Sequence, residues 1–228
     1  MKILNFAFKY IMQMTNKIGF LFDLDGVLID SEREYSRIWN EINEAFPTGR
    51  DNLANEIKGQ TLTKILSENF PDGDVREKVR IMLHAKEKDM RYEYCRGAEE
   101  FLSQLAGRQL PTAVVTSSDE VKMGHLYADI PEFRSKIDVV VDASMVRNSK
   151  PNPEGYLLGS ESLGRPVRNC AVFEDSVQGV KAGRASGAYV VGIAGTKKRE
   201  ELAPHCDVVV DSLLEIDIES LCQILMDR

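Results

Sequence analysis

Short apolar runs alternate with amphipathic segments through the second half of the chain. The apolar runs predict strands at residues 113–115, 137–141, 171–173, 189–193 and 208–210. Between them, helical spacing of apolar residues predicts helices at residues 98–105, 121–128, 153–163 and 177–186, and a last helix from Glu215. Alternating helices and strands are typical of a parallel sheet with right-handed crossovers. The pattern therefore predicts the α/β class, with a Rossmann-like parallel sheet flanked by helices.

A further strand is expected at residues 18–22, and a long helical stretch follows it. From Tyr35 to about Tyr94 the apolar residues keep helical spacing, with a break at Gly59 and no convincing strand. Such an insertion is most simply a cap over the ends of the strands. We therefore divide the chain into an α/β core domain at residues 15–33 and 96–228, an all-helical cap domain at residues 34–95, and an N-terminal extension at residues 1–14.

The N-terminal residues lack the features of a targeting segment. Residues 1–15 have neither a proper apolar core nor a small-residue cleavage site, so a secretory signal peptide is not expected. Met14 stands just before the first predicted strand and is a candidate translation start. No run reaches the roughly 18 to 20 apolar residues of a membrane span. We expect a cytoplasmic protein without a membrane partner.

The composition fits a globular enzyme and argues against a nucleic-acid partner. The chain of 228 residues is 43% hydrophobic and 29% charged, which is ordinary for a globular protein. Its net charge of -7 speaks against a basic nucleic-acid-binding surface, but an anionic substrate needs only local positive charge and a metal. The cysteines show no zinc-ligand spacing and are typical of free thiols in a reducing compartment. We expect a monomer or a weak homodimer.

Two aspartates end the first predicted strand. Asp23 and Asp25 follow the apolar run, and Gly26 breaks the strand directly after them. Carboxylates at the end of a buried strand are costly to desolvate unless a cation or hydrogen bonds compensate. Mg2+ prefers such oxygen ligands. The pair indicates a metal-dependent site, and the structural alternative is a solvated Asp-Gly turn.

Later segments also join strand-like runs to polar groups. Residues 112–118 end on hydroxyls, residues 149–154 carry one lysine between turn residues, and residues 170–187 place two acids after a strand. All of these groups fall at the carboxyl ends of predicted parallel strands, where active sites of such sheets lie. Together with the Asp23 segment, they resemble the ordered motifs of the haloacid dehalogenase superfamily over roughly residues 18–212. The helical cap is similar to that of the β-phosphoglucomutase-like group.

The resemblance implies phosphoryl transfer through an aspartyl-phosphate, with Mg2+ as cofactor. Asp23 is then the nucleophile and a metal ligand, because a bridging metal offsets its repulsion from the phosphate. Asp25 protonates the leaving oxygen and then activates water, a role that requires a pKa raised by the site. Its backbone carbonyl also binds the metal. The presence of Asp25 favours cleavage of an oxygen ester, since the dehalogenase and phosphonoacetaldehyde-cleaving branches lack this acid.

The remaining acids and the lysine also receive roles from the resemblance. Lys150 binds the transferring phosphate and steadies Asp23, whereas a lone lysine is otherwise simply solvated. Asp175 is a direct ligand of Mg2+, and Glu174 is a second acid near the metal. The structural alternative is that both acids cap the helix that begins at Ser176.

Several polar residues are candidates for binding the substrate. Thr116 hydrogen-bonds a phosphate oxygen, or it caps a helix, a role that Ser117, Ser118 or Asp119 could fill equally well. Ser117 and Ser118 are expected to contact the substrate from the core. Lys58 and Gly59, a Lys-Gly pair in the cap, are expected to contact it from the opposite side.

The cap positions distinguish a phosphatase from a mutase. The family mutase holds a second phosphate with an arginine three residues after the Lys-Gly pair and with a Lys-Asn pair past the second motif. Here these positions are Leu62, Asp119 and Glu120, and the two acids would repel a second phosphate. Arg50 or Lys64 could supply the missing charge, so the mutase stays open as an alternative.

The sequence thus predicts a Mg2+-dependent phosphatase of small phosphorylated metabolites, with sugar phosphates as the expected class. The first alternative is a phosphosugar mutase of the β-phosphoglucomutase type. A second alternative, from a different class, is a non-catalytic binding module on the same scaffold. A decayed enzyme would have lost at least one of Asp23, Asp25, Lys150 and Asp175, and all are present.

Overall fold

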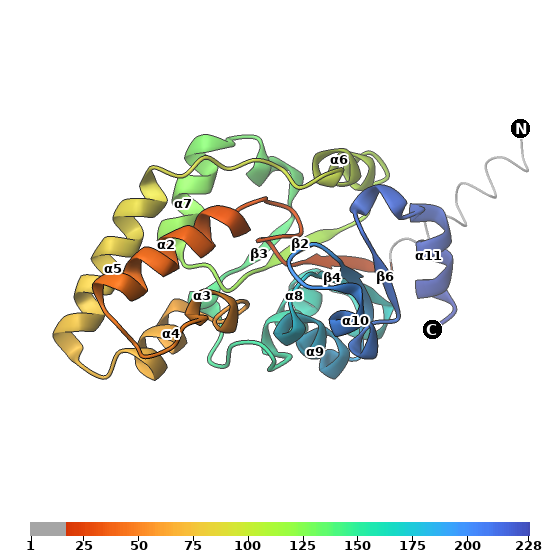
Figure 1. The fold of residues 1–228 in the computed structure, drawn as a ribbon. Coiled ribbons are helices and arrows are strands. Elements are labelled where there is room, and N and C mark those ends of the chain that lie inside the picture. The colour runs from red at the N-terminus through yellow and green to blue at the C-terminus, as the bar shows by residue number, and fades with distance from the viewer. Residues whose placement is uncertain (1–16) are drawn as a thin grey trace, which may run out of the picture.

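A parallel sheet forms the centre of the molecule, whose computed structural model describes residues 17–228. The expectations for residues 1–14, and residues 15–16 of the expected core, lie outside the described residues. Six strands of the described part form one sheet in the order β3-β2-β1-β4-β5-β6, and all neighbours are parallel (Figure 1). The strands are β1 Gly19–Phe22, β2 Thr112–Val115, β3 Val139–Val141, β4 Cys170–Glu174, β5 Tyr189–Ile193 and β6 Val208–Val210. The predicted α/β class is confirmed.

Helices cover both faces of this sheet because successive side chains of each strand point to opposite faces. On one face, Leu21 and Val172 pack in a cluster with Tyr156. On the other face, Phe20 and Phe22 belong to the larger cluster that extends into the cap. The helices of the first face are α8 Glu154–Ser162, α9 Val177–Ser186 and α10 Arg199–Leu202, and those of the second are α6 Ala98–Gly107, α7 Glu120–Asp129 and α11 Ile218–Met226 (Figure 1).

The segment between β1 and β2 is helical, as predicted, and forms the cap. Its helices are α2 Glu32–Ala45, α3 Leu53–Glu56, α4 Leu62–Asn69 and α5 Gly73–Lys88 (Figure 1). The expected break at Gly59 separates α3 from α4, and this residue has a φ of +77°, which favours glycine. Ile38, Trp39 and Leu83 of the cap belong to the same buried cluster as the sheet. An inserted helical cap is thus confirmed, while its expected bounds, 34–95, stay a prediction.

The C-terminal helix begins later than predicted. It was expected from Glu215, but α11 begins at Ile218. The Asp217 side chain accepts a hydrogen bond from the Ser220 amide at 2.8 Å, which fixes the N-terminus of the helix at this point. Glu215 instead ends one of the short 3-10 turns, which are η1 Phe133–Lys136, η2 Ala143–Met145, η3 Val167–Asn169, η4 Ala203–His205 and η5 Leu213–Glu215. Among residues 17–228, no helix combines the length and apolar character needed to cross a membrane.

Candidate active site

The carboxyl ends of the two central strands bring three of the expected acids together. In the β1–β4 pair, Phe22 lies opposite Phe173. Asp23 follows β1 directly, and its amide donates to the Phe173 carbonyl at 2.9 Å. Glu174 ends β4 and Asp175 follows it. Because the strands are parallel and in register, side-chain oxygens of Asp23, Glu174 and Asp175 lie within 4.8 Å of one another.

Lys150 is a buried member of this acidic cluster rather than a solvated lysine. Its Nζ donates to the Asp23 carboxylate, to Glu174 Oε1 at 2.6 Å and to the Val115 carbonyl at 3.0 Å. Burial opposes its charge, but the carboxylates of Asp23 and Glu174 outweigh burial and raise the pKa of Lys150. The lysine is therefore charged and joins β1, β2 and β4 at the site.

Glu174 is fully engaged by protein donors. Besides Lys150, the Tyr156 hydroxyl donates to Oε1 at 2.6 Å. The amide and hydroxyl of Ser176 donate to Oε2 at 3.3 and 3.1 Å. Because both of its oxygens already accept hydrogen bonds, Glu174 contributes mainly negative charge to the cluster. The carboxylate oxygens of Asp23 and Asp175 accept fewer hydrogen bonds.

The residues of the cluster fit a divalent cation. Asp175 Oδ2 is buried and has no hydrogen-bond partner in the described part of the chain. Burial, together with the charges of Asp23 and Glu174, raises the pKa of Asp175 well above its usual value. Burial also raises the pKa of Asp23 to about 7, against the attraction of Lys150. One lysine beside three carboxylates leaves a deficit of positive charge, which a hard cation with oxygen ligands would remove.

Two glycines allow these acids to take their positions. Gly26 has a φ of +76°, and a Cβ at this residue would lie 2.0 Å from Asp175 Oδ2. A Cβ at Gly179, near the start of α9, would lie 1.8 Å from the carboxyl carbon of Glu174. Only glycine leaves room for the carboxyl groups at either position.

Asp25 lies in a different environment from Asp23, although only one residue separates them. Lys122 Nζ is 2.5 and 2.6 Å from its two carboxylate oxygens. Ser118 Oγ donates to Asp25 at 3.1 Å, and Ser31 Oγ donates to it as well. Burial alone would raise the pKa of Asp25, but Lys122 and the two hydroxyls hold it below its usual value. The raised pKa that we expected for this acid is thus wrong for the observed arrangement.

The hydroxyls after β2 have different partners. Thr116 Oγ1 accepts a hydrogen bond from the Ser118 amide at 3.0 Å, which closes a turn before α7, while the cap of that helix is Asp119. Ser117 Oγ donates to the Gly59 carbonyl at 2.8 Å and so joins the core to the cap. The roles of Thr116, Ser117 and Ser118 toward a phosphate stay predictions.

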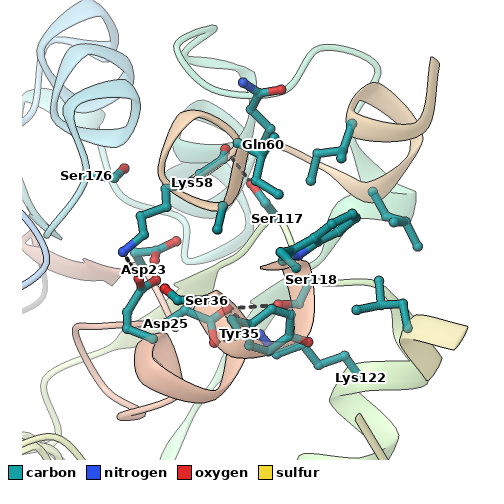
Figure 2. Close-up of a pocket in the computed structure, with 18 of the residues that line it drawn as sticks. Asp23, Asp25, Tyr35, Ser36, Lys58, Gln60, Ser117, Ser118, Lys122 and Ser176 are labelled. Atoms are coloured by element: carbon teal, nitrogen blue, oxygen red, sulfur yellow. Dashed lines mark hydrogen bonds and ion pairs between the residues drawn. The ribbon is translucent and has the colours of Figure 1, made fainter. Parts of the chain in front are cut away.

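A cavity of about 110 Å³ separates these strand ends from the cap (Figure 2). Lys58 lines it and forms an ion pair with Glu32. Thr116, Lys150 and Glu174 lie outside its lining, whereas the other expected site residues face it. The lining comprises Asp23, Asp25, Ser117, Ser118, Asp119, Lys122, Asp175 and Ser176 from the core and Glu32, Tyr35, Ser36, Trp39, Ala54, Ile57, Lys58, Gly59, Gln60, Leu62, Ile65, Leu83 and Glu87 from the cap side.

Three polar residues that the sequence analysis missed extend the site toward the cap. Lys122 Nζ lies 3.9 Å from the centroid of the Tyr35 ring (Figure 2). The Tyr35 hydroxyl donates to Glu87. Lys122 carried no usable signal, because Ser118 lies before α7 begins at Glu120 and the two residues therefore do not share a helix face. No pattern pointed to Tyr35 or Glu87 either, and these come from different cap helices.

His84 connects the cap to the core. Its Nε2 lies 3.1 Å from Asp119 Oδ2, so it joins α5 of the cap to the start of α7 in the core. Asp119 also accepts from the Lys122 amide at 3.0 Å and thereby caps α7.

Comparison with known proteins gives the family. The family model described as haloacid dehalogenase-like hydrolase matches residues 20–193. Hexitol phosphatase A of Escherichia coli K12 is 30% identical, and the match covers 88% of this chain and 93% of that protein. A β-phosphoglucomutase of Mycobacterium bovis is 28% identical over 86% of this chain and 90% of its own.

Solved structures agree with the fold. The crystal structure of a hydrolase from Pseudomonas syringae superposes with a TM-score of 0.76 at 22% identity, covering 86% of this chain and 94% of that one. At this identity the likeness concerns the fold alone. The family match, which includes the strand with Asp23 and the strand with Glu174, is independent of it. The chain belongs to the haloacid dehalogenase-like hydrolases.

Proposed function

We propose that this protein is a Mg2+-dependent phosphatase of small phosphorylated metabolites, with sugar phosphates as the expected class. The observation that carries the proposal is the pairing of two unlike aspartates at the end of β1. Asp23 lies beside Lys150 and the unsatisfied Asp175 oxygen, while Asp25 faces the same cavity with a cation and two hydroxyl donors. Asp23 is thus suited to nucleophilic attack beside a lysine and a site for a cation, and Asp25 is suited to proton transfer.

The expected reaction begins with attack of Asp23 on the phosphorus atom. The bond from phosphorus to the leaving oxygen breaks, and the leaving group needs a proton. Lys122 and two hydroxyls keep Asp25 as a carboxylate before the reaction, so Asp25 must first take up a proton from solvent, which it then passes to the leaving oxygen. Lys150 holds Asp23 and offers positive charge to the transferring group. In the second half, the Asp25 carboxylate takes a proton from water, which releases phosphate from the aspartyl-phosphate and regenerates Asp23.

A cation bound at the acidic cluster would offset the repulsion between the Asp23 carboxylate and the phosphate. Asp23 and Asp175 are the side chains that would hold it, with the Asp25 backbone carbonyl as a further expected ligand. The buried Asp175 oxygen without a partner supports this assignment. The choice of Mg2+ follows from the all-oxygen donor set.

A phosphosugar mutase is the second candidate, and relatives that bear this name support it. Against it, Leu62 lines the cavity where a second phosphate would need a cation. Asp119 lines it too and already interacts with His84. A non-catalytic binding module is disfavoured because a binding role alone would not require the complete set of acids together with Lys150.

The proposal is tested by assaying the purified protein with a panel of phosphate esters, in Mg2+ and in EDTA. We expect Mg2+-dependent release of phosphate from several sugar phosphates. With glucose 1-phosphate and catalytic glucose 1,6-bisphosphate, free phosphate should exceed glucose 6-phosphate. Mutase flux above hydrolysis would favour the second candidate, and no turnover of any ester would favour the binding module. We further expect a monomer or weak homodimer.

A further inference from the structure

The wall of the cavity opposite the acidic cluster contains a buried acid that the reaction does not use. Glu87, on α5 of the cap, lines the cavity and is only 3% exposed. Tyr35 donates to its Oε1, which fixes the orientation of the carboxyl group. Its Oε2 is buried and has no hydrogen-bond partner among residues 17–228. A buried acceptor without a donor destabilises the fold, so a ligand that donates to it is favoured.

A second buried acceptor on the cap side also lacks a hydrogen-bond donor among the described residues. Gln60, in the turn between α3 and α4, also lines the cavity (Figure 2). Its Nε2 donates to the Glu56 carbonyl at 3.1 Å, so the amide nitrogen has a partner. This oxygen is buried without a hydrogen bond in the described part of the molecule. Two unpartnered acceptors therefore lie in the wall of one cavity.

The positive charges of the cavity are already neutralised. Of the lining residues, Lys58 pairs with Glu32, and Lys122 pairs with both carboxylate oxygens of Asp25. The remainder of the cap wall is mostly apolar, with Trp39 as its largest side chain. This end of the cavity can therefore accept hydrogen bonds, but it has no unpaired lysine or arginine with which to receive a second anion.

We propose that Glu87 is a specificity-determining residue that selects leaving groups with hydroxyl donors and rejects those with a second negative charge. The inference rests on the proposed phosphatase function. A hydroxyl of the leaving group would satisfy Glu87 Oε2, and Gln60 could accept from another. A carboxylate or a second phosphate at the same place would meet the buried acid without a free cation, which disfavours it by charge repulsion.

Two esters of equal length test the selection. Sorbitol 6-phosphate and 6-phosphogluconate are both open chains of six carbons, and they differ in a hydroxymethyl or carboxylate group at carbon 1. We expect the wild type to favour sorbitol 6-phosphate in kcat/KM by roughly a hundredfold or more, since buried polar groups discriminate strongly. Glu87→Gln keeps the shape and removes the charge. It should narrow this ratio by about tenfold, mainly through a lower KM for 6-phosphogluconate.

Matched variants separate a selective role from a structural one. Glu41→Gln changes another cap glutamate, which pairs with Arg37 and Lys86 and does not line the cavity, and it should leave the ratio unchanged. Tyr35→Phe removes the hydroxyl that orients Glu87 and should narrow the ratio by less than Glu87→Gln does. Thermal unfolding shows whether Glu87→Gln is folded. If it is not, Tyr35→Phe provides the test in its place.

The outcomes distinguish this inference from the proposed function. If p-nitrophenyl phosphate is hydrolysed with Mg2+ but the wild type treats both six-carbon esters alike, the inference fails and the phosphatase assignment stands. An unchanged ratio in folded Glu87→Gln, or in Tyr35→Phe where it is the only folded variant, would also overturn the inference alone. If none of the three esters releases phosphate, the proposed function fails and the inference falls with it.

Discussion

The two sides of the catalytic cavity differ in how their charges are balanced. On the metal side, Lys150 pairs with Asp23 and Glu174, and Asp175 keeps an oxygen without a partner among residues 17–228. On the side of Asp25 and Lys122, which we call the Asp25 side, Asp25 has its own lysine and two hydroxyl donors. The first arrangement is incomplete without a cation, and the second is complete within the protein. Two aspartates separated by one residue can therefore take opposite roles, because neighbouring side chains rather than sequence position set their chemistry.

The largest effect is expected at the centre of the metal side. Asp23→Asn removes the nucleophile, and turnover should fall by roughly a thousandfold or more because the covalent route is lost. The fold should persist, since asparagine has nearly the same shape. Phosphate release and circular dichroism measure the two quantities. A variant that keeps more than about a tenth of the wild-type rate would remove Asp23 from the role of nucleophile.

The next effect should come from the Asp25 side and should include a loss of stability. Lys122→Met leaves Asp25 buried without its charged partner, which is expected to cost about 3–5 kcal/mol in the free energy of unfolding. Turnover should fall as well, because Asp25 would no longer be held in place. Denaturant unfolding measures the stability, and Lys181→Met, at an exposed position on α9, is the control. Equal stabilities for the two variants would contradict the charge balance inferred for the Asp25 side.

A third substitution should weaken binding of the cation more than binding of the substrate. Asp175→Ala removes the unsatisfied oxygen and should raise the Mg2+ concentration for half-maximal activity by more than about tenfold. The KM for the ester should change much less, because Glu174 and Asp23 keep part of the charge. Titration of the rate with Mg2+ at fixed ester gives both values. An unchanged Mg2+ dependence would move the metal away from Asp175.

The smallest effect concerns pH. The pKa of Asp23 is about 7 in the metal-free fold and 3.8 as its ordinary value, so the folded state holds its proton more tightly than the unfolded state. This group stabilises the fold below about pH 4 relative to higher pH, and the advantage is lost as pH rises through 7. In EDTA, the unfolding temperature should therefore fall between pH 5.5 and 8. Mg2+ should restore it by at least about 2–4 °C at pH 8 and by less at pH 5.5.

Asp23→Asn supplies the control for this pH effect. The variant lacks the titrating group and should lose part of the fall in unfolding temperature, while Asp175 retains its own contribution. If Mg2+ stabilised the wild type equally at both pH values, the charge deficit of the metal side would not be the source of the stabilisation.

The sequence reveals the metal side better than the Asp25 side. Asp23, Glu174 and Asp175 follow predicted strands, and strand ends of a parallel sheet meet at one edge, so their proximity could be inferred. The cluster around Asp25 depends on how α2, α5 and α7 pack, and helical periodicity gives no direct account of such packing. Lys122 and Glu87 are therefore found only in the structure. The last helix was predicted to begin at Glu215, because nothing in the apolar pattern marks Asp217 as the capping residue that places its start at Ile218.

The central claim is that Asp23, and not Asp25, carries the phosphoryl group. The enzyme can be mixed with Mg2+ and a substrate identified from the panel, quenched in acid within one turnover, and reduced with borohydride. Reduction converts an acyl phosphate to a hydroxyl, so peptide mass spectrometry should find homoserine at residue 23. Homoserine at residue 25, or rapid phosphate release with no modified residue at any quench time, would contradict the account.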